Sequence, residues 1–187
     1  MEFLDIIDKN GHPTGEIVER KYAHLHGIWH RTSHLWLMTE KDGRVEILLQ
    51  KRSKDKDSFP GCYDISSAGH IPAGVGYAES ALRELEEELG VTAAEGDLIF
   101  CGDRTVIWDA EFHGEPFHDR QISRVFMMWL DMEAEEFSVQ DSEVESVMWM
   151  DFEECLRGVE KDLFEHCIVM EELEMVRKGM EKSKKGV

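Results

Sequence analysis

Short runs rich in apolar residues recur along much of the chain, bounded by polar segments, which is the pattern of β-strands. Such runs occupy residues 3–7, 16–19, 33–39, 45–52, 98–107, 123–131 and 144–150. Asn10-Gly11 follows the first run, and Asp42-Gly43 separates the third from the fourth. Because Asp-Gly favours a two-residue turn, the sequence predicts a hairpin between the third and fourth strands.

One helix stands out between residues 78 and 89, where apolar residues recur at intervals of three and four. Gly90 follows it at the position expected for a helix cap. Two further helices are predicted at 151–157 and 160–181, ahead of a frayed basic tail, KSKKGV. Strands on either side of one strong helix, with more helices at the end, predict an α/β (α+β) fold in which helices cover the faces of a mixed sheet.

Chain length and net charge indicate how many domains the protein has and which kinds of partner it can bind. A chain of 187 residues can bury a sizeable core, so we expect a single domain over residues 1–187. The formal net charge of −19 disfavours a nucleic-acid polymer as partner, but a small phosphorylated molecule can bind where cations neutralise the site.

The N-terminal sequence and the spacing of the cysteines indicate the cellular compartment in which the protein is expected. The first residues, MEFLDIIDKNGH, lack a basic segment followed by a long apolar run, so the sequence predicts no signal peptide and no membrane span. A cytoplasmic protein is expected. The four cysteines form no CxxC pair and are expected to be free thiols, and a homodimer stays open.

Acidic residues gather near the end of the helix predicted at 78–89. Glu87 and Glu88 are three and four positions after Glu84 and therefore lie on the same face of the helix as Glu84. A negative charge near a helix C-terminus is unfavourable by roughly 0.3 to 1 kcal/mol, so stability does not favour this arrangement. A solvated acidic face is the plain alternative in so acidic a chain. Carboxylates on one face also suit Mg²⁺ or Mn²⁺, and Arg83 is spaced to orient Glu87 by an ion pair.

The run GHIPAGVGYAESALRELEEELGV, residues 69–91, resembles the Nudix box, G-x5-E-x7-REUxEExGU, where U is aliphatic. The positions in register are Gly69, Arg83, Glu84, Leu85, Glu87, Glu88, Gly90 and Val91. Val75 replaces the first glutamate of the pattern, which leaves weaker metal binding or an altered substrate open.

This resemblance implies a Nudix-type α/β/α sandwich and a metal-dependent hydrolase of a diphosphate compound. It implies that Glu84, Glu87 and Glu88 bind Mg²⁺ (or Mn²⁺). It also implies catalytic roles for Arg83, Glu87 and Glu88, and a substrate-binding role for Gly69.

A second resemblance, over residues 3–150, is to isopentenyl diphosphate isomerase and isomerase-like Nudix hydrolases. The segments HRTSHLWL, LLQKRSKDKDSFPGCYDISSAGH and DRQISRVF carry it. It implies metal binding by His30 and His70, and diphosphate binding by Arg52 and Lys56.

Two positions depart from the isomerase. Ala68 stands where the isomerase needs a catalytic cysteine, and Gln121 where it needs a glutamate. Since alanine cannot exchange a proton, hydrolysis is favoured over isomerisation. The isomerase and a non-catalytic, nucleotide-binding Nudix domain are the alternatives.

The expected reaction is attack of water on phosphorus in a small diphosphate compound, with a nucleoside diphosphate derivative as the leading substrate. Candidates for the general base are Glu88, Asp119, Glu143 and Glu145. Trp108 begins a polar segment and is expected to stack on a base or an isoprenoid. The histidines of HLHGIWHRTSH are expected to be packing or surface residues, with extra weight on His30 from the resemblance, because no cysteine or carboxylate lies near them in sequence.

Overall fold

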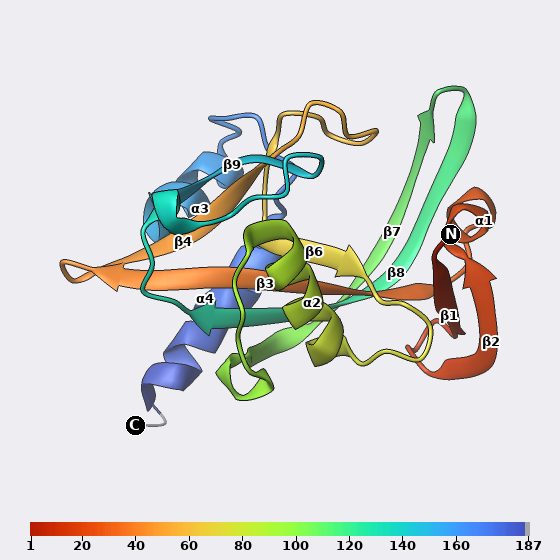
Figure 1. The fold of residues 1–187 in the computed structure, drawn as a ribbon, viewed down its shortest axis with the longest axis horizontal. Coiled ribbons are helices and arrows are strands. Elements are labelled where there is room, and N and C mark those ends of the chain that lie inside the picture. Colours follow the sequence, from red (N-terminus) through yellow and green to blue (C-terminus); the bar gives the residue numbers. More distant parts are fainter. Residues whose placement is uncertain (186–187) are drawn as a thin grey trace.

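The computed structural model describes residues 1–185 and contains a seven-stranded mixed sheet with helices on both faces (Figure 1). The strands are β3 (His30–Lys41), β4 (Arg44–Arg52), β5 (Tyr63–Asp64), β6 (Ser67–His70), β7 (Ile99–Phe112), β8 (Glu115–Trp129) and β9 (Val144–Asp151). Their order is β5-β4-β3-β8-β7, with β6 paired to β3 and β9 paired to β4. β3 and β8 run parallel and the other pairs run antiparallel, which confirms the predicted mixed sheet.

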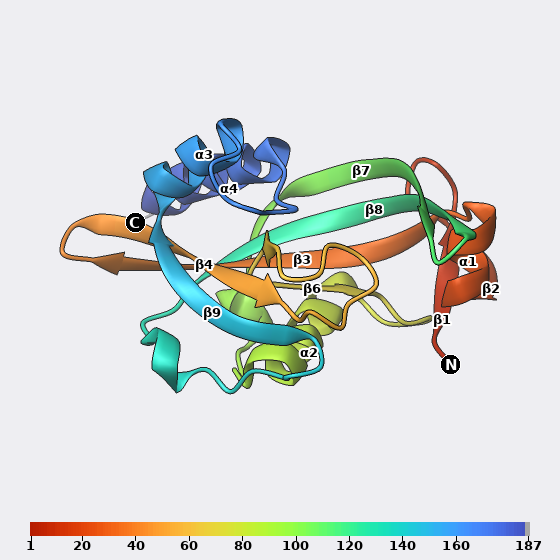
Figure 2. The same ribbon diagram turned by 90° about the horizontal axis from the view of Figure 1, so that it is seen from above.

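The helices form two outer layers, as the view along the sheet shows (Figure 2). α2 (Tyr77–Leu89) covers one face, and α3 (Phe152–Glu160) with α4 (Met170–Lys185) covers the other. Side chains of β3 alternate between two cores, because successive residues of a strand point to opposite faces. Leu35 and Leu37 pack toward α2, whereas Trp36 and Met38 pack toward α3 and α4. The predicted α/β/α sandwich is confirmed.

An N-terminal hairpin of β1 (Phe3–Ile7) and β2 (Pro13–Glu19) forms a separate two-stranded sheet. α1 (Arg20–His26) follows it and packs against β8, beside the long β7–β8 hairpin (Figure 1). The sequence did not predict α1, because two turns are too short to show helical periodicity. Two short 3-10 helices, η1 (Glu95–Asp97) and η2 (Ala134–Glu136), complete the elements of the described chain.

The predicted turn and cap are present. Asp42 and Gly43 have φ values of 52° and 75°, as a tight hairpin turn between β3 and β4 requires. Gly90 ends α2 with φ 70°, and its N–H donates to the carbonyl of Glu86 at 3.0 Å.

The pairing of β3 creates the opening in which the site lies. β8 occupies one edge of β3 along most of its length. The other edge is shared: β4 pairs with Met38–Lys41, and β6 pairs with Thr32–Leu35. β4 and β6 therefore diverge from a common partner, and side chains from both strands face the gap between them. The sequence did not predict β5 or β6, which are only two and four residues long.

Several predicted bounds were wrong. β7 extends to Phe112 and β8 begins at Glu115, beyond the predicted ends at 107 and 123. Their outer halves pair only with each other and form a two-stranded arm that leaves the rest of the sheet. α4 begins at Met170 rather than 160, after an irregular segment in which Asp162 has φ 52°. Residues 182–185 of the predicted frayed tail are helical, and 186–187 lie outside the described residues.

Within residues 1–185, no helix combines the length and the apolar character needed to cross a membrane. The four cysteines, all of which the structure describes, are free thiols as predicted.

Candidate active site

α2 carries its three carboxylates along one wall of the opening. Arg83 joins two of them, because its Nη1 donates to Glu87 Oε2 at 2.7 Å and its Nη2 to Glu84 Oε1 at 2.5 Å. The predicted Arg83–Glu87 ion pair is therefore present. Leu85 and Leu89 are fully buried against the sheet and hold the helix in place.

Glu88 is the most confined of the three acids, with 7 % of its surface exposed. Burial raises the pKa of Glu88 to about 8, although the nearby Ser67 side chain lowers it, and the charge of Glu84 adds to the rise. Glu88 Oε2 is buried and has no hydrogen-bond partner among residues 1–185. A hard divalent cation would supply that partner and relieve the repulsion, so the three carboxylates fit Mg²⁺ or Mn²⁺.

Gly69 lies against the same acids. A Cβ built at Gly69 would lie 2.2 Å from the carboxyl carbon and Oε1 of Glu84, which is far too close for any side chain. Glycine at position 69 therefore allows the Glu84 carboxylate to lie directly against the β6 backbone, and any side chain there would displace it.

The loop that contains Val75 is held by other residues. Arg31 Nη2 donates to the Val75 carbonyl at 3.0 Å and to Asp5 Oδ2 at 2.6 Å. Asp5 Oδ2 also accepts from the Gly74 N–H at 2.9 Å. Asp5 and Arg31 thus fasten the loop at the position where the Nudix pattern has a glutamate.

A polar cleft of about 390 Å³ lies between the diverging strands. Its lining includes ten residues singled out from the sequence: Arg52, Lys56, Ala68, Gly69, His70, Arg83, Glu84, Glu87, Glu88 and Glu143. It also includes five polar residues that sequence reasoning missed: Glu2, Arg20, Gln50, Asp64 and Gln140. The cleft therefore has carboxylates on the α2 side and cationic side chains on the β4 side.

The two cations from the β4 side contact acids of the cleft. Arg52 Nη1 donates to Asp64 Oδ2 at 2.8 Å, while its Nε and Nη2 donate to the Ser58 carbonyl at 3.1 and 2.9 Å. Lys56 forms an ion pair with Glu143. Glu143 lines the cleft, whereas Glu145 pairs with Lys51 at 3.1 Å and is not among the cleft-lining residues.

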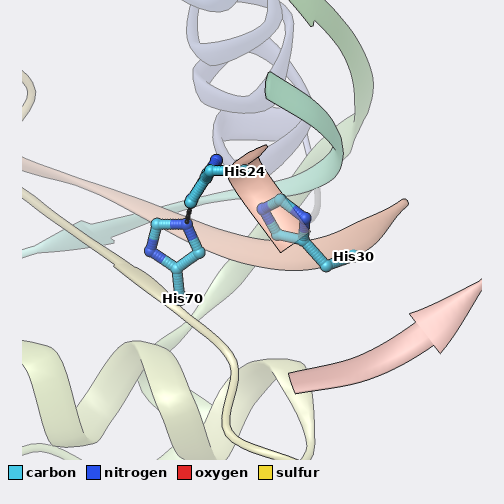
Figure 3. A group of neighbouring side chains, drawn as sticks. All are labelled: His24, His30 and His70. Atoms are coloured by element: carbon cyan, nitrogen blue, oxygen red, sulfur yellow. Dashed lines mark hydrogen bonds between the residues drawn. The ribbon is translucent and has the colours of Figure 1, made fainter. Parts of the chain in front are cut away.

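A second cluster joins three histidines from separate elements: His24 of α1, His30 of β3 and His70 of β6 (Figure 3). One ring nitrogen of each lies within 4.8 Å of the others, and His24 Nε2 is 3.0 Å from His70 Nε2. Asp119 Oδ1, from β8, lies 3.8 Å from both His24 Nδ1 and His30 Nε2. Three imidazole rings, whose nitrogens could act as metal ligands, therefore lie close together, and the Asp119 carboxylate lies near two of them.

The pKa values in this cluster favour binding of a metal ion over protonation of the histidines. Burial lowers the pKa of His24 to about 3 and also lowers the pKa values of His30 and His70, so the three rings are neutral at pH 7. His30 Nδ1 donates to the Ile28 carbonyl at 2.9 Å, which leaves a lone pair on its Nε2. Burial raises the pKa of Asp119 to about 6.

Three buried atoms of the cluster have no hydrogen-bond partner in the described chain: His24 Nδ1, His30 Nε2 and Asp119 Oδ1. Neutral imidazoles with free lone pairs and a buried carboxylate are the donor set of a transition-metal site. No carboxylate lies near these histidines in sequence, but the strand pairing of His30 with Gln121 brings Asp119 beside them. That parallel pairing joins segments about ninety residues apart and could not be read from local sequence.

Trp108 lies on the β7–β8 hairpin rather than in the cleft lining. Its ring stacks on Phe59 at a centroid distance of 5.4 Å and meets Phe117 at 5.9 Å. Across the hairpin, Trp108 is the register partner of Asp119, so it adjoins the histidine cluster.

Comparisons with known proteins assign the family. A family model described as NUDIX domain matches residues 29–167. The chain is 38 % identical over 165 residues to Nudix hydrolase 3 of Arabidopsis thaliana, with 86 % of this chain covered, but it spans only 21 % of that plant protein. It is 34 % identical over 162 residues to an uncharacterized Nudix hydrolase of Clostridium acetobutylicum, covering 87 % of this chain and 76 % of the relative.

Solved structures share the fold at low sequence identity. DR0079 from Deinococcus radiodurans superposes with a TM-score of 0.66 at 18 % identity, covering 94 % of this chain and 98 % of that one. The NUDIX domain of Shewanella oneidensis NrtR, in complex with ADP ribose, gives 0.56 at 16 % identity, covering 81 % of this chain and 86 % of that one. The family model and the clostridial relative together show that the chain belongs to the Nudix hydrolase family.

Proposed function

We propose that the protein hydrolyses a small diphosphate compound, with a nucleoside diphosphate derivative as the leading substrate, in a reaction that needs Mg²⁺ or Mn²⁺. The observation that carries this proposal is the unpartnered, buried oxygen of Glu88 in a cleft whose opposite side presents Arg52 and Lys56. The α2 carboxylates require cations, and Arg52 and Lys56, each paired with an acid of the cleft, can turn to a phosphate group, so a metal–diphosphate complex complements both sets of side chains.

In this proposal Glu84, Glu87 and Glu88 hold the divalent ions. When bound, such ions neutralise diphosphate charge and lower the pKa of water. Arg83 keeps the oxygens of Glu84 and Glu87 in position through its two hydrogen bonds. Lys56 exchanges its ion pair with Glu143 for a phosphate oxygen, and Arg52 orients the adjacent loop while its charge attracts the same phosphates.

Of the four candidates for the general base, only two line the cleft. Glu88 and Glu143 line the cleft, and Glu143 becomes free to accept a proton when Lys56 turns to the substrate. Asp119 faces the histidine cluster, and Glu145 is paired with Lys51. We therefore favour Glu88 or Glu143 as the base.

The histidine cluster is proposed as a second metal centre. His30 and His70 are the ligands that the isomerase resemblance implies, and the geometry adds His24 and Asp119. Nitrogen donors favour Mn²⁺, Co²⁺ or Zn²⁺ over Mg²⁺. His24 lies outside the segment that the family model matches, so this centre draws on α1, the helix that follows the N-terminal hairpin.

The proposed substrate class has support from a structural neighbour. The Shewanella domain binds ADP ribose, which is a nucleoside diphosphate derivative. A cytoplasmic location and a homodimer stay predictions from the sequence.

The test is a screen of diphosphate compounds with Mg²⁺, with Mn²⁺ and with a chelator. Wild-type protein is expected to release a monophosphate or phosphate only with metal, and Glu87→Gln and Glu88→Gln are expected to lower kcat at least about 100-fold. Full activity of both variants at limiting Mg²⁺ would remove the metal assignment.

Two other outcomes would favour the alternatives. Tight binding without turnover would indicate a nucleotide-binding domain. Formation of dimethylallyl diphosphate from isopentenyl diphosphate, followed by NMR, would indicate an isomerase despite Ala68 in the cleft wall.

A further inference from the structure

Gln50, on β4, carries a side-chain amide that makes no hydrogen bond with any residue of 1–185. The residue is only 4 % exposed, yet it lines the polar cleft. An amide has two donor hydrogens and an acceptor oxygen, and a buried amide without partners destabilises a folded protein. Packing alone therefore does not explain a glutamine at this position.

The alternation of β4 directs Gln50 toward the layer of α2. Leu48 belongs to the core beneath α2, whereas Ile47 and Leu49 belong to the core beneath α3 and α4. Gln50 and Arg52 therefore share the α2-facing side of β4 with Leu48. Two residues along a strand span about 7 Å, so Gln50 lies about that far from a side chain proposed to attract the phosphates.

Asp64 of β5 is the strand partner of Gln50 and also lines the cleft. Its Oδ2 accepts from Arg52 Nη1 at 2.8 Å, and its Oδ1 accepts from the Ile65 N–H at 2.8 Å. Because each carboxylate oxygen has two lone pairs, Asp64 can accept from a further donor. The free amide and this carboxylate thus lie side by side, next to Arg52.

The rest of the cleft offers little apolar surface. Within the described chain, only Ala68 and Gly69 among the lining residues lack a polar side chain, and no lining residue is a larger aliphatic or a Phe, Tyr or Trp. An alkyl chain gains affinity from apolar burial, which this lining does not provide. A hydroxylated group gains affinity from hydrogen bonds, which Gln50 and Asp64 can form.

We propose that Gln50 determines specificity by hydrogen-bonding the hydroxyl groups of a sugar attached to the diphosphate, with Asp64 as a second acceptor. This inference rests on the proposed diphosphate substrate and specifies the group next to its phosphates. A hydroxyl both donates and accepts, so it can pair with either end of the amide. A ligand without hydroxyls leaves the amide unpaired and is selected against. Nucleoside diphosphate derivatives meet the requirement because a ribose adjoins their diphosphate, whereas isopentenyl diphosphate does not.

The test compares two five-carbon ligands, the non-hydrolysable methylene analogues of ribose 5-diphosphate and of pentyl diphosphate. Calorimetry with the full chain and Mg²⁺ is expected to show at least about tenfold tighter binding of the ribose ligand. Gln50→Met keeps the length of the side chain but removes its hydrogen bonds, and it is expected to weaken the ribose ligand about tenfold and leave the pentyl ligand unchanged. Thr39→Val, at a buried polar residue of β3 outside the cleft lining, is the matched control and is expected to change neither affinity.

Equal affinity of the wild type for the two ligands, or an unchanged preference in Gln50→Met, would overturn the proposal. Thermal unfolding without ligand gives an independent readout. Removal of an unpartnered amide is expected to leave the thermal midpoint unchanged or higher. A lower midpoint would mean that the amide has a structural partner, and the proposal would again be overturned.

Hydrolysis is measured separately, with the oxygen-bridged forms of both ligands. A preference for the ribose ligand in a protein without turnover refutes only the proposed activity. If Gln50→Met lowers kcat equally for both compounds and leaves both affinities unchanged, Gln50 acts on the attacking water and only the sugar contact is refuted. Failure of the wild type to bind either ligand refutes both.

Discussion

Nε2 of His24 and Nε2 of His70 lie 3.0 Å apart, although 46 residues separate them in the chain. Since burial keeps both rings neutral, one of these nitrogens donates a hydrogen bond and the other accepts it. A metal ion held by these residues would satisfy the unpartnered atoms of His24, His30 and Asp119.

Metal binding at this centre is the first prediction. Co²⁺ added to metal-free protein is expected to give a visible absorption band, and His24→Gln or His30→Gln is expected to weaken Co²⁺ binding at least about tenfold. His26→Gln is the matched control, because His26 is exposed on the same helix. An absorption titration that is unchanged in both variants would contradict a metal centre at these histidines. Bound metal is also expected to raise the thermal midpoint, and a chelator to lower it.

The close approach of Gly69 to Glu84 gives a second prediction. The added methyl group of Gly69→Ala collides with the end of a flexible side chain, so Glu84 is expected to turn away while the fold survives. Calorimetry with Mn²⁺ is expected to show at least about fivefold weaker binding at the α2 carboxylates, with a thermal midpoint near that of the wild type. Gly96→Ala is the control, since a Cβ there meets no atom within 4 Å. Unaltered Mn²⁺ affinity in Gly69→Ala would show that Glu84 does not bind the ion.

The Lys56–Glu143 ion pair gives a third prediction. Lys56→Gln removes a cation from the cleft, and KM for the diphosphate substrate is expected to rise about tenfold, in line with the loss of one charged hydrogen bond. Lys54→Gln removes the same charge from an exposed side chain two residues away and is expected to leave KM within about twofold. Equal effects of the two substitutions would mean that general electrostatic attraction, and not a contact by Lys56, governs binding.

His34 and Glu172 give a fourth prediction, on stability. His34 Nδ1 lies 2.9 Å from Glu172 Oε1, and Glu172 also accepts from Trp36 Nε1 at 3.2 Å and from Arg104 Nη1 at 3.0 Å. Burial by itself lowers the pKa of His34, but the Glu172 carboxylate outweighs burial and raises it. The folded protein therefore holds this proton more tightly than the unfolded chain.

The sign of the pH dependence follows from that rise. The stabilisation is complete below the ordinary histidine pKa of about 6.5 and is lost as the pH rises through the higher folded value, with a slope of at most about 1.4 kcal/mol per pH unit. Urea unfolding between pH 6 and pH 9 is expected to show this loss in the wild type and not in His34→Gln. Because metal-free Glu88 also has a raised pKa and contributes in the same direction, the difference between the two proteins is the quantity to compare. Parallel curves would contradict the raised pKa of His34.

Local sequence predicted the parts of the fold and site that depend on short spacing. The stripe of Glu84, Glu87 and Glu88 and the ion pair of Arg83 with Glu87 follow from helical periodicity, and Gly90 ends the helix where a left-handed cap was expected. The β3–β4 turn follows from Asp42-Gly43. The existence of α1, β5 and β6 was missed, because short elements carry little apolar periodicity. The bounds of the β7–β8 arm were missed because they depend on the pairing of the two strands with each other and not on packing in the core.

By itself, then, the sequence determined the helix, its acidic face and the family resemblance, since each is a relation between residues within one or two dozen positions. Only the tertiary structure decided that Asp119 joins His24, His30 and His70, that Arg52 and Lys56 face the α2 carboxylates, and that Phe59 meets Trp108. The physical reason is that these contacts depend on which strands share an edge of β3 and in what register, and strand pairing between distant segments is set by the packing of the whole sheet.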